Sequence, residues 1–203
     1  NIYKNKKIKI GYYSSDFYDH ATMYLISGLL REHNKNEFEI IVFNYGKTKS
    51  TKFVKEVMQN VDLFKDVGDL PDLEIVRLSR ELQIDIAVDL KGYTLDSKTK
   101  LFAYGLAPIQ INYLGYPGSL GANFIDYIVA DKILIPEGEE KYYSEKIIYL
   151  PHTYQPNDNL REISQVASNK EDYGFPKDSL ILSCLNSTYK ITPVELEIWT
   201  RIL

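Results

Sequence analysis

The strongest constraint on the fold is a series of short, almost uninterrupted apolar runs separated by segments with helical periodicity. The runs that predict strands are residues 7–13, 38–45, 63–66, 84–90, 109–114, 127–130 and 147–149. Helices are predicted at residues 23–31, 51–61, 73–83 and, as a short helix, 101–104. Strands that are apolar on both faces are typical of parallel sheets covered by helices on both sides. Because parallel crossovers are right-handed, the pattern predicts an α/β fold with a doubly wound, Rossmann-like, mainly parallel sheet. In the helix at 73–83, we expect Leu73, Val76, Leu78 and Leu82 on or near the inner face.

The composition changes after Pro151, which predicts a second domain. Residues 1–154 form the first domain, the polar residues 155–170 a linker, and residues 171–203 the start of a further α/β domain. There we expect a strand at 180–185 that buries Cys184, a loop at 186–189, and a helix opened by Thr192, Pro193 and Glu195 as a capping box. Because strand, loop and helix only begin such a domain, we expect the chain to be a fragment with a truncated second domain.

The overall charge and the cysteine content narrow the class of protein. The net charge of -4 argues against non-specific nucleic-acid binding, which rests on basic surfaces. The single cysteine allows no disulfide within the chain, which fits a reducing, cytoplasmic compartment. No apolar run has the length of a membrane span, and no segment resembles a signal peptide. We therefore expect neither nucleic acid nor membrane as a partner.

A turn rich in glycine and proline follows the predicted strand at 109–114. It reads Leu114-Gly115-Tyr116-Pro117-Gly118. Gly115 and Gly118 allow a close approach of the backbone or a positive φ, while Pro117 stiffens the turn. This combination at the carboxyl end of a strand suits a ligand loop, but a tight turn in an α/β domain explains it equally well.

Polar residues also follow the first strand. Asp16 and His20 lie four residues apart at the carboxyl end of that strand, where open parallel sheets bind ligands. The carboxylate can orient the imidazole and stabilise its charged form. The alternative is that Asp16 or Asp19 caps the helix that begins near Ala21, which is the commoner outcome for an isolated pair.

Two further segments carry polar groups. The strand at 84–90 exits through residues 89–94 at the same edge, although an ordinary strand exit has the same appearance. Lys190 precedes the last helix and could bind an anion, although a lone lysine is more often a solvated surface residue.

The three histidines and Cys184 form no metal-ligand pattern. The glycine fingerprint of dinucleotide enzymes and the nucleophile elbow of serine hydrolases are also absent from the sequence.

Taken in order, several segments resemble the catalytic region of the O-GlcNAc transferase family, especially its bacterial members attached to tetratricopeptide repeats, with SPINDLY-like relatives. The segments are GYYSSDFYDH, VDLKGYT, APIQINYLGYPGSLGANFIDYIVAD, YSEKIIYLPHTYQPND, YGFP and LNSTYKITP. They cover nearly the whole chain from Lys7 onward. The resemblance implies the first half of a GT-B glycosyltransferase, whose two Rossmann-like domains face each other across a cleft.

The resemblance also implies a reaction. N-acetylglucosamine passes from a UDP-sugar to a serine or threonine of an acceptor protein, with inversion and without a metal cofactor. Helical repeats would lie upstream in the same polypeptide. We expect the fragment alone to be inactive and to bind the nucleotide poorly, because most of the nucleotide-binding domain is missing from it.

Candidate site residues follow from the matching positions. His20 matches a family histidine near the sugar and the acceptor, and Asp16 matches an aspartate proposed to help move the acceptor proton. The residues that match substrate-contacting positions are Thr22, Tyr93, Thr94, Leu114, Gly115, Tyr189 and Lys190, with the last two at the nucleotide. Ala21, Lys98 and Ser187 depart from the family pattern. These departures leave open another donor sugar, such as fucose. A separate alternative is a non-catalytic protein-binding module with the same α/β fold.

Overall fold

The computed structural model describes residues 3–47, 51–166 and 168–203. The chain divides into two compact units, Asn1–Arg161 and Glu162–Leu203. This division falls within the polar segment at 155–170. The predicted domain ranges themselves stay a prediction.

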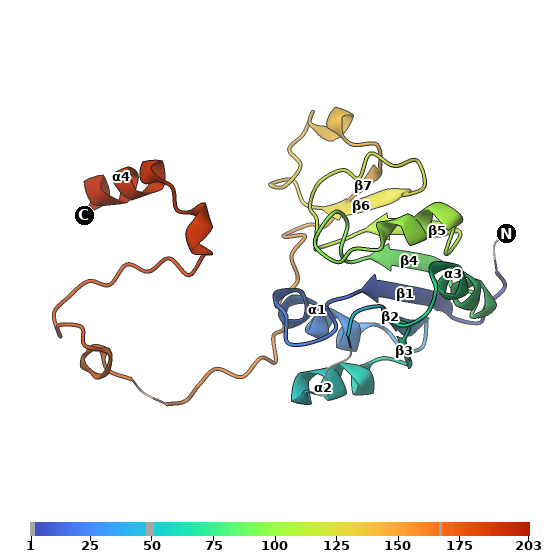
Figure 1. Ribbon diagram of the computed structural model, residues 1–203, viewed down its shortest axis with the longest axis horizontal. Helices are drawn as coiled ribbons and strands as arrows, with labels where there is room; N and C mark the ends of the chain where they lie inside the picture. Colours follow the sequence, from blue (N-terminus) through green and yellow to red (C-terminus); the bar gives the residue numbers. More distant parts are fainter. Residues whose placement is uncertain (1–2, 48–50, 167) are drawn as a thin grey trace. The chain divides into compact units, whose positions relative to one another are not determined.

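The first unit is built on a parallel sheet (Figure 1). Its strands are β1 (Ile8–Ser14), β2 (Phe38–Asn44), β3 (Leu63–Asp66), β4 (Ile86–Asp89), β5 (Ile109–Asn112), β6 (Tyr127–Ala130) and β7 (Lys146–Tyr149). They lie in the order β3-β2-β1-β4-β5-β6-β7, and each neighbouring pair is parallel. The predicted α/β, Rossmann-like sheet is confirmed.

Helices cover both faces of this sheet. The helices of the first unit are α1 (Ala21–Glu32), α2 (Lys52–Asn60), α3 (Asp72–Glu81) and the 3-10 helices η1 (Thr99–Tyr104) and η2 (Glu140–Tyr142). Side chains alternate along β1, so Tyr12 packs into the core formed with α1 and α2, while Tyr13 packs into the core formed with α3 and η1. The winding in both directions from β1 therefore produces two separate hydrophobic layers.

On α3 the predicted inner positions of Val76, Leu78 and Leu82 are confirmed, but that of Leu73 is wrong. Leu73 is 63% exposed, whereas Ile75 and Ser79 are completely buried. An apolar pattern does not identify Ser79, because this side chain is polar. The Ser79 hydroxyl is nevertheless satisfied, since it lies 2.6 Å from the Tyr13 hydroxyl and donates to the Leu106 carbonyl at 2.9 Å.

The segment after β7 returns to α1 and is fixed there by Asp158. This carboxylate accepts hydrogen bonds from Arg31 at 2.8 Å and from Ser27 at 3.1 Å. Its backbone packs against Gly28, where a Cβ would meet the Asp158 Cα at 3.0 Å. The hydrogen bond from Arg31 is the main reason that the pKa of Asp158 falls from 3.8 to about 2.

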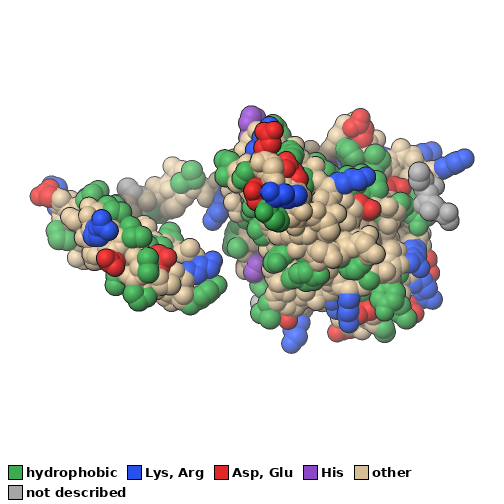
Figure 2. Space-filling view, turned by 90° about the horizontal axis from the view of Figure 1, so that it is seen from above, with side chains coloured by type: hydrophobic (Ala, Val, Ile, Leu, Met, Phe, Trp, Pro, Cys, Tyr) green, Lys and Arg blue, Asp and Glu red, His purple; other side chains and the backbone are tan. Residues whose placement is uncertain are grey.

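The second unit contains the 3-10 helices η3 (Lys170–Tyr173) and η4 (Thr188–Lys190), followed by α4 (Pro193–Ile202). The predicted capping box is confirmed, since Thr192 accepts from the backbone of Val194 and Glu195 accepts from the backbone of Thr192. The predicted strand at 180–185 is wrong, and Cys184 is exposed. A strand needs a neighbour, and the described residues of this unit contain none. Figure 2 shows apolar side chains on the surface of this smaller unit, at the left of the view.

Replacing Asp158 by asparagine should destabilise the first unit near neutral pH. Because the folded-state pKa lies below 3.8, the stabilisation is fully present above about pH 4 and is lost as the pH falls through about 2. We expect a loss of about 1–2 kcal/mol near pH 7, measured by urea unfolding, and a shrinking difference in acid.

The matched control is Glu32→Gln, which removes the other carboxylate beside Arg31. The Glu32 side chain is 66% exposed, so its loss should cost less than about 0.5 kcal/mol. Equal losses in the two variants, or a loss in the Asp158 variant that persists in strong acid, would contradict this role of Asp158.

Candidate functional site

The candidate site lies where the winding of the sheet reverses. The chain moves outward from β1 through β2 to β3 and then crosses to β4 on the other side of β1. In such sheets, the carboxyl ends of the two strands at the reversal border a ligand crevice. Residues 15–20 follow β1 and residues 90–94 follow β4, so both segments lie at this edge.

Asp16 is a buried, paired carboxylate at this edge. The Lys91 ammonium donates to its Oδ2 at 2.7 Å, and both residues are only 5% exposed. Ser15 lies 3.4 Å from Oδ1, and the backbone N–H of Asp16 donates to Ser14. Lys91 is not among the residues predicted for the site. Its signal in the sequence is a lysine directly after a buried strand, which local patterns do not connect to Asp16.

His20, rather than an aspartate, caps α1. Its Nδ1 accepts a hydrogen bond from the backbone N–H of Thr22 at 3.2 Å. The interpretation that Asp16 or Asp19 caps this helix is wrong, since Asp16 pairs with Lys91 and Asp19 accepts from Thr51 at 3.0 Å. An imidazole nitrogen occupies the cap because His20 immediately precedes the first helical residue.

The cap selects one tautomer of the neutral His20 ring. Asp16 Oδ2 lies 3.6 Å from His20 Nδ1, which brings the two predicted residues together without a hydrogen bond between them. Since Nδ1 accepts from Thr22, the neutral ring carries its proton on Nε2. In this arrangement His20 offers an N–H donor at Nε2.

The exit of β4 is organised by Asp89. This buried carboxylate accepts from the backbone N–H groups of Lys91 and Gly92 and from the Thr99 hydroxyl, at 2.9, 3.1 and 2.8 Å. Burial raises the pKa of Asp89, while these hydrogen bonds oppose the shift. Asp89 therefore determines the direction in which the following residues leave the strand.

The hydroxyl groups of Tyr93 and Thr94 donate hydrogen bonds to backbone carbonyls of the loops. Tyr93 donates to the Leu120 carbonyl at 2.7 Å, and Thr94 donates to the Lys91 carbonyl at 3.0 Å. The Tyr93 ring is exposed and meets the Tyr116 ring edge-on at 5.7 Å between centroids. The two Tyr93 contacts join the β4 exit to the segment after β5, whereas the Thr94 contact lies within the β4 exit.

That turn packs directly on the end of β4. A Cβ on Gly115 would lie 2.1 Å from the Leu90 carbonyl oxygen, so the close approach predicted for this glycine is confirmed. The positive φ of the turn, 77°, falls on Leu114 rather than on Gly115 or Gly118. Buried packing of the Leu114 side chain offsets this strain.

Asn112 holds the same turn and was not identified from the sequence. Its side-chain amide donates to the carbonyls of Tyr116 and Gly118 at 3.1 and 3.0 Å. Its Oδ1 is the only buried side-chain polar atom without a hydrogen-bond partner in the described part of the chain.

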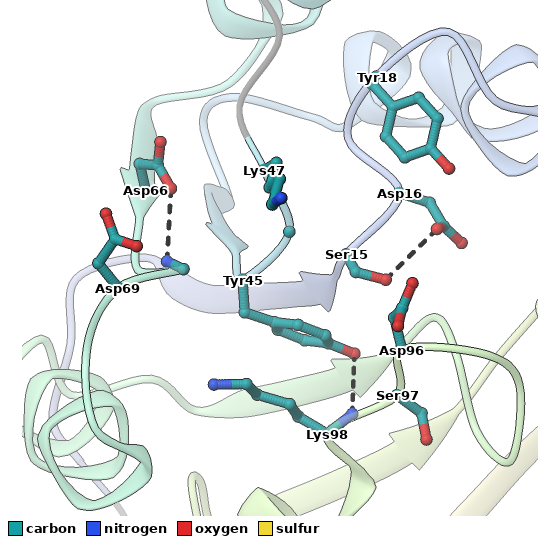
Figure 3. A pocket seen from close by; sticks show the side chains of 12 residues that line it. Ser15, Asp16, Tyr18, Tyr45, Lys47, Asp66, Asp69, Asp96, Ser97 and Lys98 are labelled. Atoms are coloured by element: carbon teal, nitrogen blue, oxygen red, sulfur yellow. Dashed lines mark hydrogen bonds between the residues drawn. The ribbon is translucent and has the colours of Figure 1, made fainter.

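A pocket of about 990 Å³ opens beside these loops, over the ends of β1, β2 and β3. Figure 3 shows Asp66 and Asp69 on the side opposite Asp16, with the Tyr45 ring and Lys98 between them. The buried Tyr45 hydroxyl accepts from the backbone N–H of Lys98 at 3.4 Å. The pocket includes Asp16 but not His20, Tyr93 or Leu114.

Tyr189 and Lys190 belong to the second unit. Both are exposed in η4, and the Lys190 ammonium lies 5.9 Å from the centre of the Tyr189 ring. Their predicted place at a shared site stays a prediction.

The described residues show neither a metal-ligand cluster nor a helix that could span a membrane. Within residues 3–47, 51–166 and 168–203, no group of three or more His, Cys, Asp or Glu side chains is arranged as metal ligands would be. None of the helices in these same ranges is both long and apolar enough to cross a membrane.

Comparison with known proteins identifies the family. The model of the family described as Glycosyl transferase family 41 matches residues 1–165. The chain therefore belongs to glycosyl transferase family 41. The resemblance of its motifs to O-GlcNAc transferases is thereby confirmed.

Curated relatives of this family 41 chain are much longer than the chain itself. It is 33% identical over 203 residues to the Arabidopsis thaliana protein named probable UDP-N-acetylglucosamine–peptide N-acetylglucosaminyltransferase SEC. This match covers 98% of the chain and 21% of that protein. It is 28% identical over 186 residues to the Caenorhabditis elegans UDP-N-acetylglucosamine–peptide N-acetylglucosaminyltransferase, covering 90% of the chain and 16% of that protein. The chain thus spans about a fifth or less of these relatives.

A solved structure supports the same assignment. A mutant O-GlcNAc transferase from Thermobaculum terrenum matches with a TM-score of 0.82 and 27% identity, over 98% of this chain and 36% of that chain. The family 41 chain therefore has the Rossmann-like, GT-B type fold of the O-GlcNAc transferase catalytic region.

Gly115→Ala should destabilise this family 41 chain strongly. The new Cβ would meet the backbone oxygen of Leu90 at 2.1 Å, so relief requires a shift of the backbone. We expect a loss of about 2–3 kcal/mol by urea unfolding. Gly121→Ala is the control, since φ is 61° there but no atom lies within 4 Å, and it should cost about 1 kcal/mol. An equal or smaller loss at Gly115 would show that the turn does not depend on this contact.

Proposed function

We propose that this chain forms the acceptor-side domain of a protein O-glycosyltransferase. In this proposal, N-acetylglucosamine moves from UDP-GlcNAc to a serine or threonine hydroxyl with inversion at the sugar carbon. The observation that carries the proposal is that Asp16 and His20 follow β1, Tyr93 follows β4 and the Leu114–Gly115 turn follows β5, all at the carboxyl edge of a family 41 sheet. The names of the relatives from Arabidopsis thaliana and Caenorhabditis elegans supply the donor and the peptide acceptor.

The reaction is a single displacement at the sugar. The acceptor oxygen forms a bond to the anomeric carbon, the bond to the diphosphate breaks with its electron pair leaving on UDP, and the hydroxyl proton passes to the released diphosphate or to water. Because the cap leaves the His20 proton on Nε2, we propose that His20 donates a hydrogen bond to the sugar or acceptor. Asp16, already paired with Lys91, supplies fixed negative charge nearby.

The leaving diphosphate needs positive charge. We propose that Lys190, two residues before the cap of α4, stabilises the diphosphate beside Tyr189, and that no metal cofactor takes part. Thr22, Tyr93, Thr94, Leu114 and Gly115 would border the sugar and the acceptor. This division assigns the acceptor side to the first unit and the nucleotide to the second.

The setting of the enzyme is also a proposal. It includes tetratricopeptide repeats upstream in the same polypeptide, an acceptor protein or peptide as partner, and a reducing, cytoplasmic location. It includes neither nucleic acid nor a membrane. These points rest on the family and on the sequence composition.

The donor is tested with the full-length protein. We expect UDP release and sugar transfer to an acceptor peptide from UDP-GlcNAc, little or none from GDP-fucose, and unchanged rates with EDTA, measured by mass spectrometry and a UDP-release assay. Turnover with GDP-fucose alone would assign another donor. Loss of activity with EDTA would refute metal independence, and no turnover with any donor would favour the non-catalytic binding module.

His20 is tested with two variants of the full-length protein. His20→Ala removes both the ring and the helix cap, whereas His20→Asn keeps a side chain that caps helices well. We expect both variants to lose about 100-fold or more in kcat, while only the alanine variant loses stability in thermal unfolding. If His20→Asn retained the wild-type kcat, the role of His20 would be limited to the cap.

A further inference from the structure

We propose that Lys91 is a positioning residue of the reaction, which acts through Asp16 to fix the ring of His20. This inference rests on the proposed function. It concerns a buried ammonium that the outlined displacement does not use directly. Lys91 is not among the site residues that the sequence predicts.

The contact is made in a setting where an unpaired charge is costly. Both residues are 5% exposed, and Lys91 Nζ lies 2.7 Å from Asp16 Oδ2. In the described part of the chain, Lys91 is the only lysine or arginine with an ion pair to this carboxylate, and the His20 ring lies 3.6 Å from it. Burying two charges contributes little net stability, but removing one partner leaves the other uncompensated. The pair therefore constrains geometry more than it stabilises the fold.

The pair crosses the switch point of the sheet. The last β1–β4 partners are Tyr13 and Asp89, and the backbone of Leu90 donates to the Tyr13 carbonyl at 3.1 Å. Beyond this bond, the Lys91–Asp16 pair joins the two diverging loops. Lys91 itself is held at its backbone N–H, which donates to Asp89 at 2.9 Å. The ammonium is thus anchored on the rigid side of the site.

Asp16 connects the Lys91 ammonium to the His20 ring through its carboxylate. Its Oδ2 lies between the Lys91 ammonium and the His20 ring, 2.7 Å from Lys91 Nζ and 3.6 Å from His20 Nδ1. Because Lys91 compensates the carboxylate, Nδ1 remains free to accept from Thr22. Without Lys91, the carboxylate would attract a proton to Nδ1, break the cap and turn the ring. Lys91 therefore keeps the proton of the neutral ring on Nε2.

The test uses Lys91→Met, Lys91→Arg, Asp16→Asn and the double variant Lys91→Met/Asp16→Asn in the full-length protein. We expect Lys91→Met to lower kcat by about 10- to 100-fold with little change in the donor KM, and Lys91→Arg to recover part of the loss. The double variant should be no slower than Asp16→Asn alone, because Lys91 acts only through Asp16. Multiplicative losses in the double variant would overturn the proposal.

A second measurement reports the tautomer of the His20 ring directly. The ¹⁵N spectrum of the histidines, with His20 assigned by comparison with His20→Asn, should show the Nε2–H form in the wild type. In Lys91→Met a second form protonated at Nδ1 should appear, whereas the double variant should return to the wild-type pattern. An unchanged His20 signal in Lys91→Met would overturn the proposal.

The two readouts separate this inference from the proposed function. If the wild type transfers no sugar, the proposed function fails, yet the ¹⁵N spectra still decide whether Lys91 controls the ring. If Lys91→Met does not fold, the double variant replaces it, because that variant leaves no unpaired charge. A double variant whose His20 ring differs from that of Asp16→Asn would then contradict the inference.

Discussion

The position of β1 between β2 and β4 is the constraint on which the candidate site depends. The parallel register aligns Tyr13 with Phe43 on one side and with Asp89 on the other. Tyr12 and Tyr13 pack into opposite cores, and their hydroxyls meet His33 and Ser79. Because β1 is fixed on both faces and both edges, the loops after β1 and β4 begin at defined points and can carry closely spaced polar groups.

Direct contacts then hold the loops at this edge in place. The Leu90 carbonyl requires a residue without a Cβ at Gly115, and the Asn112 amide holds two carbonyls of the same turn. Asp89 fixes the start of the β4 loop, and the Lys91–Asp16 pair connects that loop to the one after β1. The groups proposed to meet a sugar are therefore attached to a preorganised framework.

Local periodicity in the sequence predicts the strands of the first unit correctly. It does not predict contacts between residues that are far apart in the chain. The strands at 63–66 and 127–130 match β3 and β6, because an apolar run is a local property. The pairing of Lys91 with Asp16 spans 75 residues, and no local pattern encodes it. His20 caps α1 because it directly precedes the first helical residue, while Asp16 pairs with Lys91. Cys184 was expected in a buried strand, but burial requires a neighbouring strand that the described residues of its unit do not provide.

The central claim is that substrates contact the carboxyl edge of this sheet at the exits of β1, β4 and β5. Hydrogen exchange of the full-length protein, with and without UDP-GlcNAc and an acceptor peptide, tests it most directly. Substrates bound at this edge should add protection at residues 15–22, 91–94 and 113–118, with little change in β2 and β3. Protection confined to other regions, with unchanged exchange in these three segments, would contradict it.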